Sequence, residues 1–258
     1  MTKTWLIART VLLEAIRRKE VFAIVLVSVL LIGSLMTVNF FKLEGLSKFY
    51  REMGLKIMSI ATALTVVVLA ARQLPREFDA RTIYPLLAKP VSRFNFLVGK
   101  MAGVMLAAAF CLGLFMIVFV VGSYWLRGSI HWVLLAQFIY LQMLMMLILA
   151  TLSFWLSLLV NLDAAITVGI MFYFMSSVIT SATTYLYATA TAFGQFGLRV
   201  LTWLLPQLTL FDLTEKVVHS EAWEPLSTGI LAQLTVYGSV FALVYLSLAL
   251  LWFRRRPL

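Results

Sequence analysis

Six long apolar runs, separated by shorter polar segments, make up most of the sequence. An α-helix needs about 20 predominantly apolar residues to cross the roughly 30 Å hydrocarbon core of a bilayer. The pattern therefore predicts an all-α, polytopic membrane protein, with a single transmembrane domain over residues 1–258. The six predicted transmembrane helices are residues 21–41, 55–74, 97–124, 132–160, 164–190 and 229–253.

Composition supports this fold class. The chain is 62% hydrophobic and only 12% charged, whereas a soluble domain carries about 25% charged residues. The net charge of +10 does not indicate a nucleic-acid partner, because the basic residues are divided among loops that border the spans. The only cysteine, Cys111, lies within an apolar run, so an intramolecular disulfide is excluded.

The distribution of positive charge predicts the orientation in the membrane. An even number of spans places both termini on one side, and 14 of the 21 Lys and Arg residues fall on that side. Loops rich in Lys and Arg stay in the cytoplasm. We therefore expect cytoplasmic N and C termini, a cytoplasmic segment at residues 75–96 and an outer segment at residues 191–228.

Helices outside the spans are expected in two places. Residues 1–20 are moderately amphipathic and predict a cytoplasmic interface helix. One arc of its wheel carries Trp5, Ala8, Val11, Leu12, Ala15 and Ile16, the opposite arc carries Thr10, Glu14, Arg17 and Arg18, and Leu6 and Leu13 interrupt the pattern. The outer segment predicts short re-entrant or interfacial helices before the sixth span, one of them capped by Thr209.

Residues typical of catalysis are missing from the pattern. His131 and His219 lie in separate outer loops and belong to no metal-ligand pair. Gly99 and Lys100 lack the upstream glycine and the following Ser or Thr of a P-loop. We therefore expect no enzyme, and no catalytic, cofactor-binding or metal-binding residues in this chain. If ATP drives the protein, another chain hydrolyses it.

The most polar segment between two spans is Arg76 to Phe96, "REFDARTIYPLLAKPVSRFNF". Pro75 suits the first turn of a helix, and Pro85 opposes continuation beyond Tyr84. A short surface helix over residues 75–84 is therefore expected, followed by a turn at Pro90 into the third span.

This segment resembles the cytoplasmic loop of ABC-2 type transporter permeases. The matching positions are Glu77, Thr82, Leu86, Leu87, Pro90, Val91, Ser92, Arg93, Gly99 and Lys100. The outer stretch Leu204 to Leu213, "LLPQLTLFDL", is similar to the P-x-L-x-x-F-x-L pattern before the sixth helix of the NosY-like branch.

The resemblance implies the transmembrane subunit of an ATP-driven exporter in a bacterial or archaeal inner membrane. Two permease chains, identical or paralogous, would pair with two nucleotide-binding ATPase subunits that hold ATP and Mg²⁺. Residues 75–84 would be a coupling helix seated in a groove of the ATPase. Its implied contacts are Arg76, Glu77, Asp79, Arg81, Thr82, Tyr84, Leu86 and Leu87, and the turn into the third span holds Pro90, Ser92 and Arg93.

Three alternatives stay open. The cytoplasmic segment could be a solvated loop that only follows the positive-inside rule. The chain could be a membrane scaffold that anchors a cytoplasmic assembly without moving a solute. On the fifth span, Ser177, Thr180, Ser181 and Thr184 share one face, which indicates either close helix packing or a polar strip along a translocation path.

Overall fold

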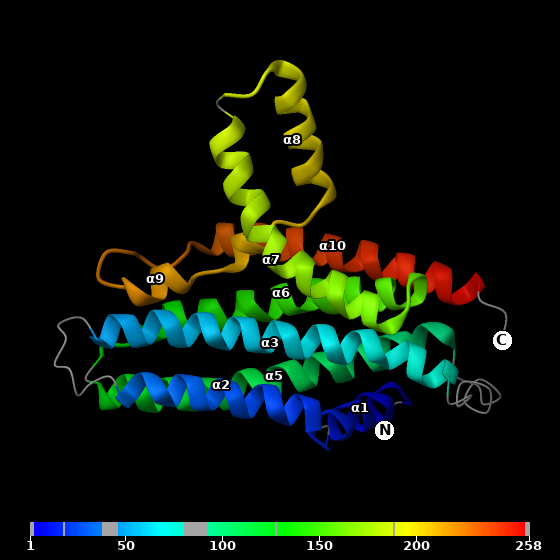
Figure 1. Ribbon diagram of the computed structural model, residues 1–258, viewed down its shortest axis with the longest axis horizontal. Coiled ribbons are helices and arrows are strands. Elements are labelled where there is room, and N and C mark those ends of the chain that lie inside the picture. Colours follow the sequence, from blue (N-terminus) through cyan, green and yellow to red (C-terminus); the bar gives the residue numbers. More distant parts are fainter. Residues whose placement is uncertain are drawn as a thin grey trace.

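The computed structural model describes residues 3–17, 19–37, 46–79, 92–126, 128–187 and 189–255. The elements in these ranges are all helical, as the apolar pattern predicts. In chain order they are α1 (Lys3–Arg17), α2 (Lys19–Thr37), α3 (Leu46–Asp79), α5 (Arg93–Trp125), α6 (Trp132–Leu159), α7 (Leu162–Tyr187), α8 (Ala192–Leu204), the 3₁₀ turn η2 (Leu208–Phe211), α9 (Thr214–Val218) and α10 (Thr228–Arg255) (Figure 1).

Among the described residues, five helices are long and apolar enough to cross a membrane: α3, α5, α6, α7 and α10. Each overlaps one of the predicted spans, numbers two to six. The apolar part of α2, Phe22–Ser34, is shorter than a crossing requires. The first of the six expected spans therefore stays a prediction.

The spans form a bundle with α3 and α6 at its centre. α3 packs against α2, α5, α6, α7 and α9, and α6 packs against α3, α5, α7 and α10. In the most apolar stretch of α3, 67% of the residues are buried, whereas in the most apolar stretch of α7 only 17% are buried. The second half of α7 rises away from the bundle and pairs with α8 in a projecting hairpin (Figure 1).

α3 is longer than expected at both ends. We expected the second span to end at Leu74 and a separate helix to begin at Pro75, but α3 runs unbroken through Pro75 to Asp79. A proline inside a helix loses the hydrogen bond to the carbonyl four residues earlier, here Ala71, at a cost of about 3 kcal/mol. Buried Leu74, and Phe78 packed against Phe253 at a ring distance of 6.0 Å, offset this cost.

At the opposite end, residues 46–54 were expected in a loop and are helical. Tyr50 and Arg51 are buried there. The Tyr50 hydroxyl donates to the carbonyl of Val118 at 3.1 Å, and Arg51 Nη1 donates to the carbonyl of Ser129 at 2.5 Å. These contacts stabilise residues 46–54 as helix, although their charged side chains led us to expect a loop.

Part of the segment 191–228, which we expected on the outer side, packs into the bundle; we call this part the re-entrant segment. Gly238 faces the ring of Phe211 in η2 and lies about 15 Å along α10 from Thr228. Non-helical backbone at this depth needs hydrogen-bond partners within the protein. The N–H of Gln207 donates to the Tyr237 hydroxyl at 3.0 Å, and the N–H of Leu208 donates to Ser176 Oγ at 2.9 Å.

One expected cap in this segment is wrong. Thr209 was expected to begin a helix, but it lies inside η2, and α9 begins at Thr214. Asp212 Oδ1 instead accepts hydrogen bonds from the N–H and the hydroxyl of Thr214, at 2.9 and 2.5 Å. Burial of Leu208 and Phe211 decides the local backbone here, and the capping pattern does not.

Candidate functional site

The candidate site lies at the end of the bundle where α1, the last turns of α3, the first turns of α5 and the end of α10 meet. We call it the charged end, defined by Glu14, Arg17, Arg72, Arg76, Glu77, Arg93 and Lys100. It flanks both sides of residues 80–91, which lie outside the described residues.

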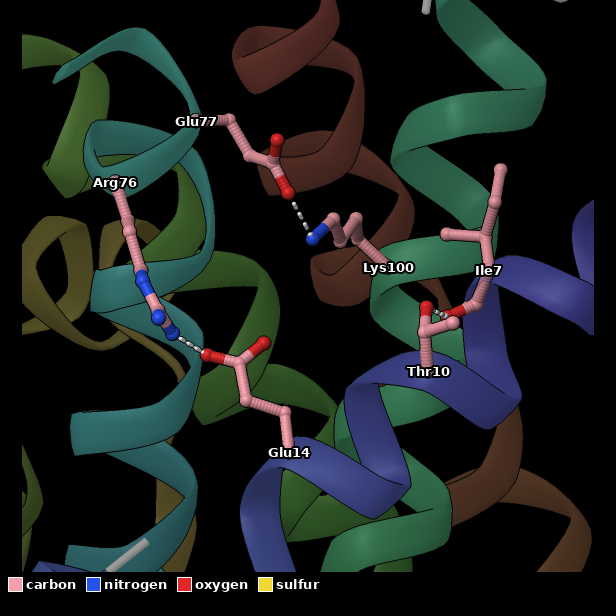
Figure 2. Close-up of polar contacts among 6 residues, drawn as sticks. All are labelled: Ile7, Thr10, Glu14, Arg76, Glu77 and Lys100. Atoms are coloured by element: carbon pink, nitrogen blue, oxygen red, sulfur yellow. Dashed lines mark hydrogen bonds and ion pairs between the residues drawn. The ribbon is translucent and has the colours of Figure 1, made fainter. Parts of the chain in front are cut away.

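Glu77 and Lys100 form an ion pair across α3 and α5. Lys100 Nζ donates to Glu77 Oε1 at 2.6 Å (Figure 2). The Lys100 side chain is 7% exposed and that of Glu77 is 22% exposed, and the ammonium also lies 5.7 Å from the centroid of the Phe96 ring. Two residues of the permease-like pattern, far apart in sequence, are thus direct partners.

A second ion pair joins α3 to the N-terminal helix. Arg76 Nη1 donates to Glu14 Oε1, and Figure 2 shows this contact beside the Glu77–Lys100 pair. Consecutive residues of α3 therefore hold α1 on one side and α5 on the other. The last turn of α3 is fixed between these two helices.

α1 itself lies in close contact with α5 along two glycines. A Cβ on Gly103 would lie 2.5 Å from Val11 Cβ and 2.8 Å from the carbonyl oxygen of Ala8, and one on Gly99 would lie 3.0 Å from Ile7 Cβ. Small residues spaced by four let helix backbones approach closely. Gly99 and Gly103 therefore form the seat of α1.

The start of α5 is fixed to the end of α10. Ser92 caps α5 by accepting a hydrogen bond from the N–H of Asn95 at 3.1 Å. Arg93 Nη1 donates to the carbonyls of Phe253 and Arg254 at 2.9 and 3.0 Å, and its guanidinium lies 5.7 Å from the centroid of the Phe253 ring. Cations near a helix C-terminus satisfy its last carbonyls and interact favourably with its dipole.

Of the implied ATPase contacts, only Arg76 and Glu77 have described side chains, and both face partners within this chain. Asp79 ends α3, but its side chain is not described. The remaining positions, Arg81, Thr82, Tyr84, Leu86, Leu87 and Pro90, lie outside the described residues, so their role stays a prediction.

The second permease-like stretch, Leu204 to Leu213, packs into the bundle and has a structural role. Pro206, Leu208, Phe211 and Leu213, its four pattern positions, are all buried. They pack among α6, α7 and α10, where Phe211 Cζ would lie 3.2 Å from a Cβ on Gly238. The spacing of these residues therefore serves to seat the re-entrant segment.

The hydroxyl face of α7 is only partly covered within the chain. Ser177, Ser181 and Thr184 are exposed, and Ser177 and Thr184 bond carbonyls of their own helix. Thr180 accepts a hydrogen bond from Thr209 Oγ1 at 3.0 Å. A second contact to η2 comes from the neighbouring Ser176, which accepts from the N–H of Leu208 at 2.9 Å and which the pattern did not single out.

Sequence reasoning also missed a polar chain between three spans. Gln142 Nε2 of α6 donates to Ser59 Oγ of α3 at 2.7 Å, and that hydroxyl lies 3.1 Å from the Tyr173 hydroxyl of α7. Ser59 and Tyr173 line a cavity of about 220 Å³ that also borders Lys56 and Asp212. The sequence did contain a signal for this contact: Gln142 and Ser59 are isolated polar residues within apolar runs. Such residues need hydrogen-bond partners within a membrane, so they could have been expected to meet.

The site offers charge pairing between helices and little catalytic chemistry. In the described ranges, no three His, Cys, Asp or Glu side chains lie close enough together to hold a metal ion. A bundle of long apolar helices, with a charged end fixed by ion pairs between helices, defines a polytopic membrane protein.

The comparison with known families is specific. The family model for ABC-2 family transporter proteins matches residues 5–258, so the chain belongs to this family. The family is a membrane transport component and is not itself catalytic. No curated protein sequence matches the chain. The resemblance found in the Arg76 to Lys100 segment is thereby confirmed at family level.

Proposed function

We propose that the chain is the permease subunit of an ATP-driven ABC exporter and that residues 80–91 receive motion from a separate ATPase subunit. One observation carries the proposal: both flanks of this segment are held by the bundle. Glu77 binds Lys100 before it, and Arg93 binds the end of α10 after it.

In this proposal these attachments let the segment act as a lever. A rigid-body movement of a docked partner can pass into helices that are stiffly connected to its contact point. Here the connections lead from α3 into α5 through Glu77, into α1 through Arg76, and from α5 into α10 through Arg93. A solvated loop with free ends would pass little of such a movement to the spans.

The exposed side chains of the projecting hairpin favour an interface with a second permease chain. Among its side chains, Tyr185 is 80% exposed, Phe193 86% and Phe196 66%. Beside them lie the hydroxyl groups of Ser181 and Thr184. In this proposal a second copy, or a paralogue, packs against the hairpin, and the translocation path runs between the two chains.

The remaining parts follow from the charge pattern and the family. The charged end and both termini face the cytoplasm of a bacterial or archaeal inner membrane, by the excess of Lys and Arg on that side. Two ATPase subunits dock there and bind ATP and Mg²⁺. Export is the direction that the family resemblance implies.

The test co-expresses the chain with a candidate P-loop ATPase subunit. Arg81→Glu and Thr82→Trp are expected to lower ATPase co-purification and stimulated hydrolysis, while membrane insertion is unchanged. Lys48→Glu, an exposed charge reversal at the opposite end of the bundle, is the matched control. Normal association and hydrolysis in both segment variants would refute the coupling role. ATP hydrolysis that never responds to a solute or to hairpin variants would favour the scaffold.

A further inference from the structure

A cavity of about 690 Å³ opens at the charged end between α1, α3 and the start of α7. Its volume falls in the range of roughly 300 to 1,000 Å³ typical of ligand sites. Seven residues line it: Thr10, Leu13, Glu14, Arg17, Arg72, Arg76 and Leu162. The Glu14–Arg76 pair on its wall is visible in Figure 2.

The lining is strongly basic. It contains three guanidinium groups and one carboxylate, a formal charge of +2. The single carboxylate, Glu14, already binds Arg76. Guanidinium groups form paired, charge-assisted hydrogen bonds with phosphate oxygens. The chemistry of the cavity thus fits a phosphate group.

Its surroundings favour a phosphate that carries acyl chains. Leu13 and Leu162 line the same cavity as the arginines. On α1, Trp5, Leu6, Leu13 and Ile16 are between 43% and 48% exposed, and they share an arc of about 100° on the helical wheel. This strip lies apart from Ala8, Val11 and Ala15, which are buried. The outer face of α1 is therefore largely apolar, with the exposed Arg9 as the one charged residue on this arc.

We infer that this cavity binds the headgroup phosphate of an anionic phospholipid, with α1 lying in the membrane interface beside it. Basic pockets between transmembrane helices are suited to anionic lipid headgroups, and an amphipathic helix with aromatic and aliphatic side chains binds the adjoining acyl region. Arg17 and Arg72 contact the phosphate. Leu13 and Leu162 contact the upper acyl chain.

The experiment is native mass spectrometry of the full-length chain, titrated separately with phosphatidylglycerol and phosphatidylcholine. Phosphatidylglycerol is expected to bind more tightly. Arg17→Gln should weaken its binding on the order of five-fold, since one basic side chain near an anionic headgroup contributes about that factor. Arg17 is exposed, so its replacement leaves the fold intact.

Two further variants test the charge argument. Glu14→Gln keeps an oxygen for Arg76 and removes the only negative charge, so it should tighten phosphatidylglycerol binding. Arg9→Gln changes an exposed arginine of the same helix that does not line the cavity, and it should bind like the wild type. Equal effects of the Arg9 and Arg17 variants would overturn the assignment.

A third arm identifies the source of the phosphate. Inorganic phosphate alone is expected to bind weakly and with no saturable site. If it binds as tightly as phosphatidylglycerol, with the same dependence on Arg17, the occupant is a soluble anion and the lipid assignment fails. If Arg17→Gln lowers ATPase association and leaves lipid binding unchanged, the cavity serves a protein partner. Because no ATPase is present in the titration, its result is independent of the coupling proposal.

Discussion

Lys100 donates to Glu77 from within the bundle, at 2.6 Å and with 7% of its own side chain exposed. The pair connects the last turns of α3 to α5 on either side of the segment that we assign to coupling. An ion pair this enclosed depends on both members, because removal of one leaves a charge without compensation.

Lys100→Met is expected to lower the free energy of unfolding by about 3 kcal/mol, because it removes the buried cation that pairs with the Glu77 carboxylate. Thermal unfolding of the purified chain in detergent measures the change. The exchange Glu77→Lys with Lys100→Glu should recover part of the loss.

The control for this pair lies at the opposite end of the bundle. Lys48 and Glu221 are 3.4 Å apart with side chains 45% and 71% exposed, so Lys48→Met should change stability by no more than about 1 kcal/mol. Equal losses in the Lys48 and Lys100 variants would mean that burial does not set the strength of the Glu77–Lys100 pair.

Gly103→Ala is expected to displace α1 from α5. The added Cβ would lie 2.8 Å from the backbone oxygen of Ala8, and backbone cannot yield as a side chain end can. Limited proteolysis should cut α1 faster in this variant, with a lower melting temperature.

Gly113 offers a matched control ten residues further along α5, since nothing lies within 4 Å of a Cβ there. Gly113→Ala should leave α1 protected and raise stability slightly, by up to about 1 kcal/mol from helix propensity. Unchanged protection of α1 in the Gly103 variant would argue against the glycine seat.

Phe211→Ala is expected to loosen the re-entrant segment and to cost roughly 3 kcal/mol, because a fully buried ring is replaced by a void. The neighbouring Leu210 is 43% exposed, and Leu210→Ala should stay within about 0.5 kcal/mol of wild type. Chemical unfolding of the two variants side by side gives the comparison. Similar stability of both would show that η2 is not anchored through its aromatic ring.

A cysteine placed at Ser181 is expected to cross-link two copies of the chain in membranes, if the hairpin packs against a second permease. The natural Cys111 is buried and does not interfere. Ile117 on α5 is 63% exposed, and a cysteine there serves as the control for random collision. Equal cross-linking at Ser181 and Ile117 would contradict the hairpin interface.

The sequence predicted most of the helices but not how far they extend. Helix α6 was expected at residues 132–160 and is found at Trp132–Leu159, because its apolar run has clear polar limits. α3 exceeds its predicted range by nine residues at one end and five at the other. Its extra turns contain charged residues that the local pattern assigns to loops, whereas partners far away in the sequence, such as Ser129 between α5 and α6, stabilise them as helix.

The N-terminal helix shows the same division. Its amphipathic pattern was recognised, yet Leu6 and Leu13 counted as interruptions. In the structure they lie on a second, exposed strip that is apolar except for Arg9 and is separate from the residues that contact α5. A helical wheel cannot separate a face that packs on protein from one that faces lipid, since both are apolar.

By itself, the sequence determined the fold class, the membrane location, the family and the positions of five spans, because burial in lipid requires long apolar runs whatever lies beside them. The tertiary structure decided the partners: Glu77 with Lys100, Arg93 with the end of α10, Phe211 with Gly238, and three arginines around one cavity. Such pairings depend on which helices are neighbours and at what depth. Which helices lie next to each other is decided by packing across the whole bundle, and this produces no periodic pattern in the sequence.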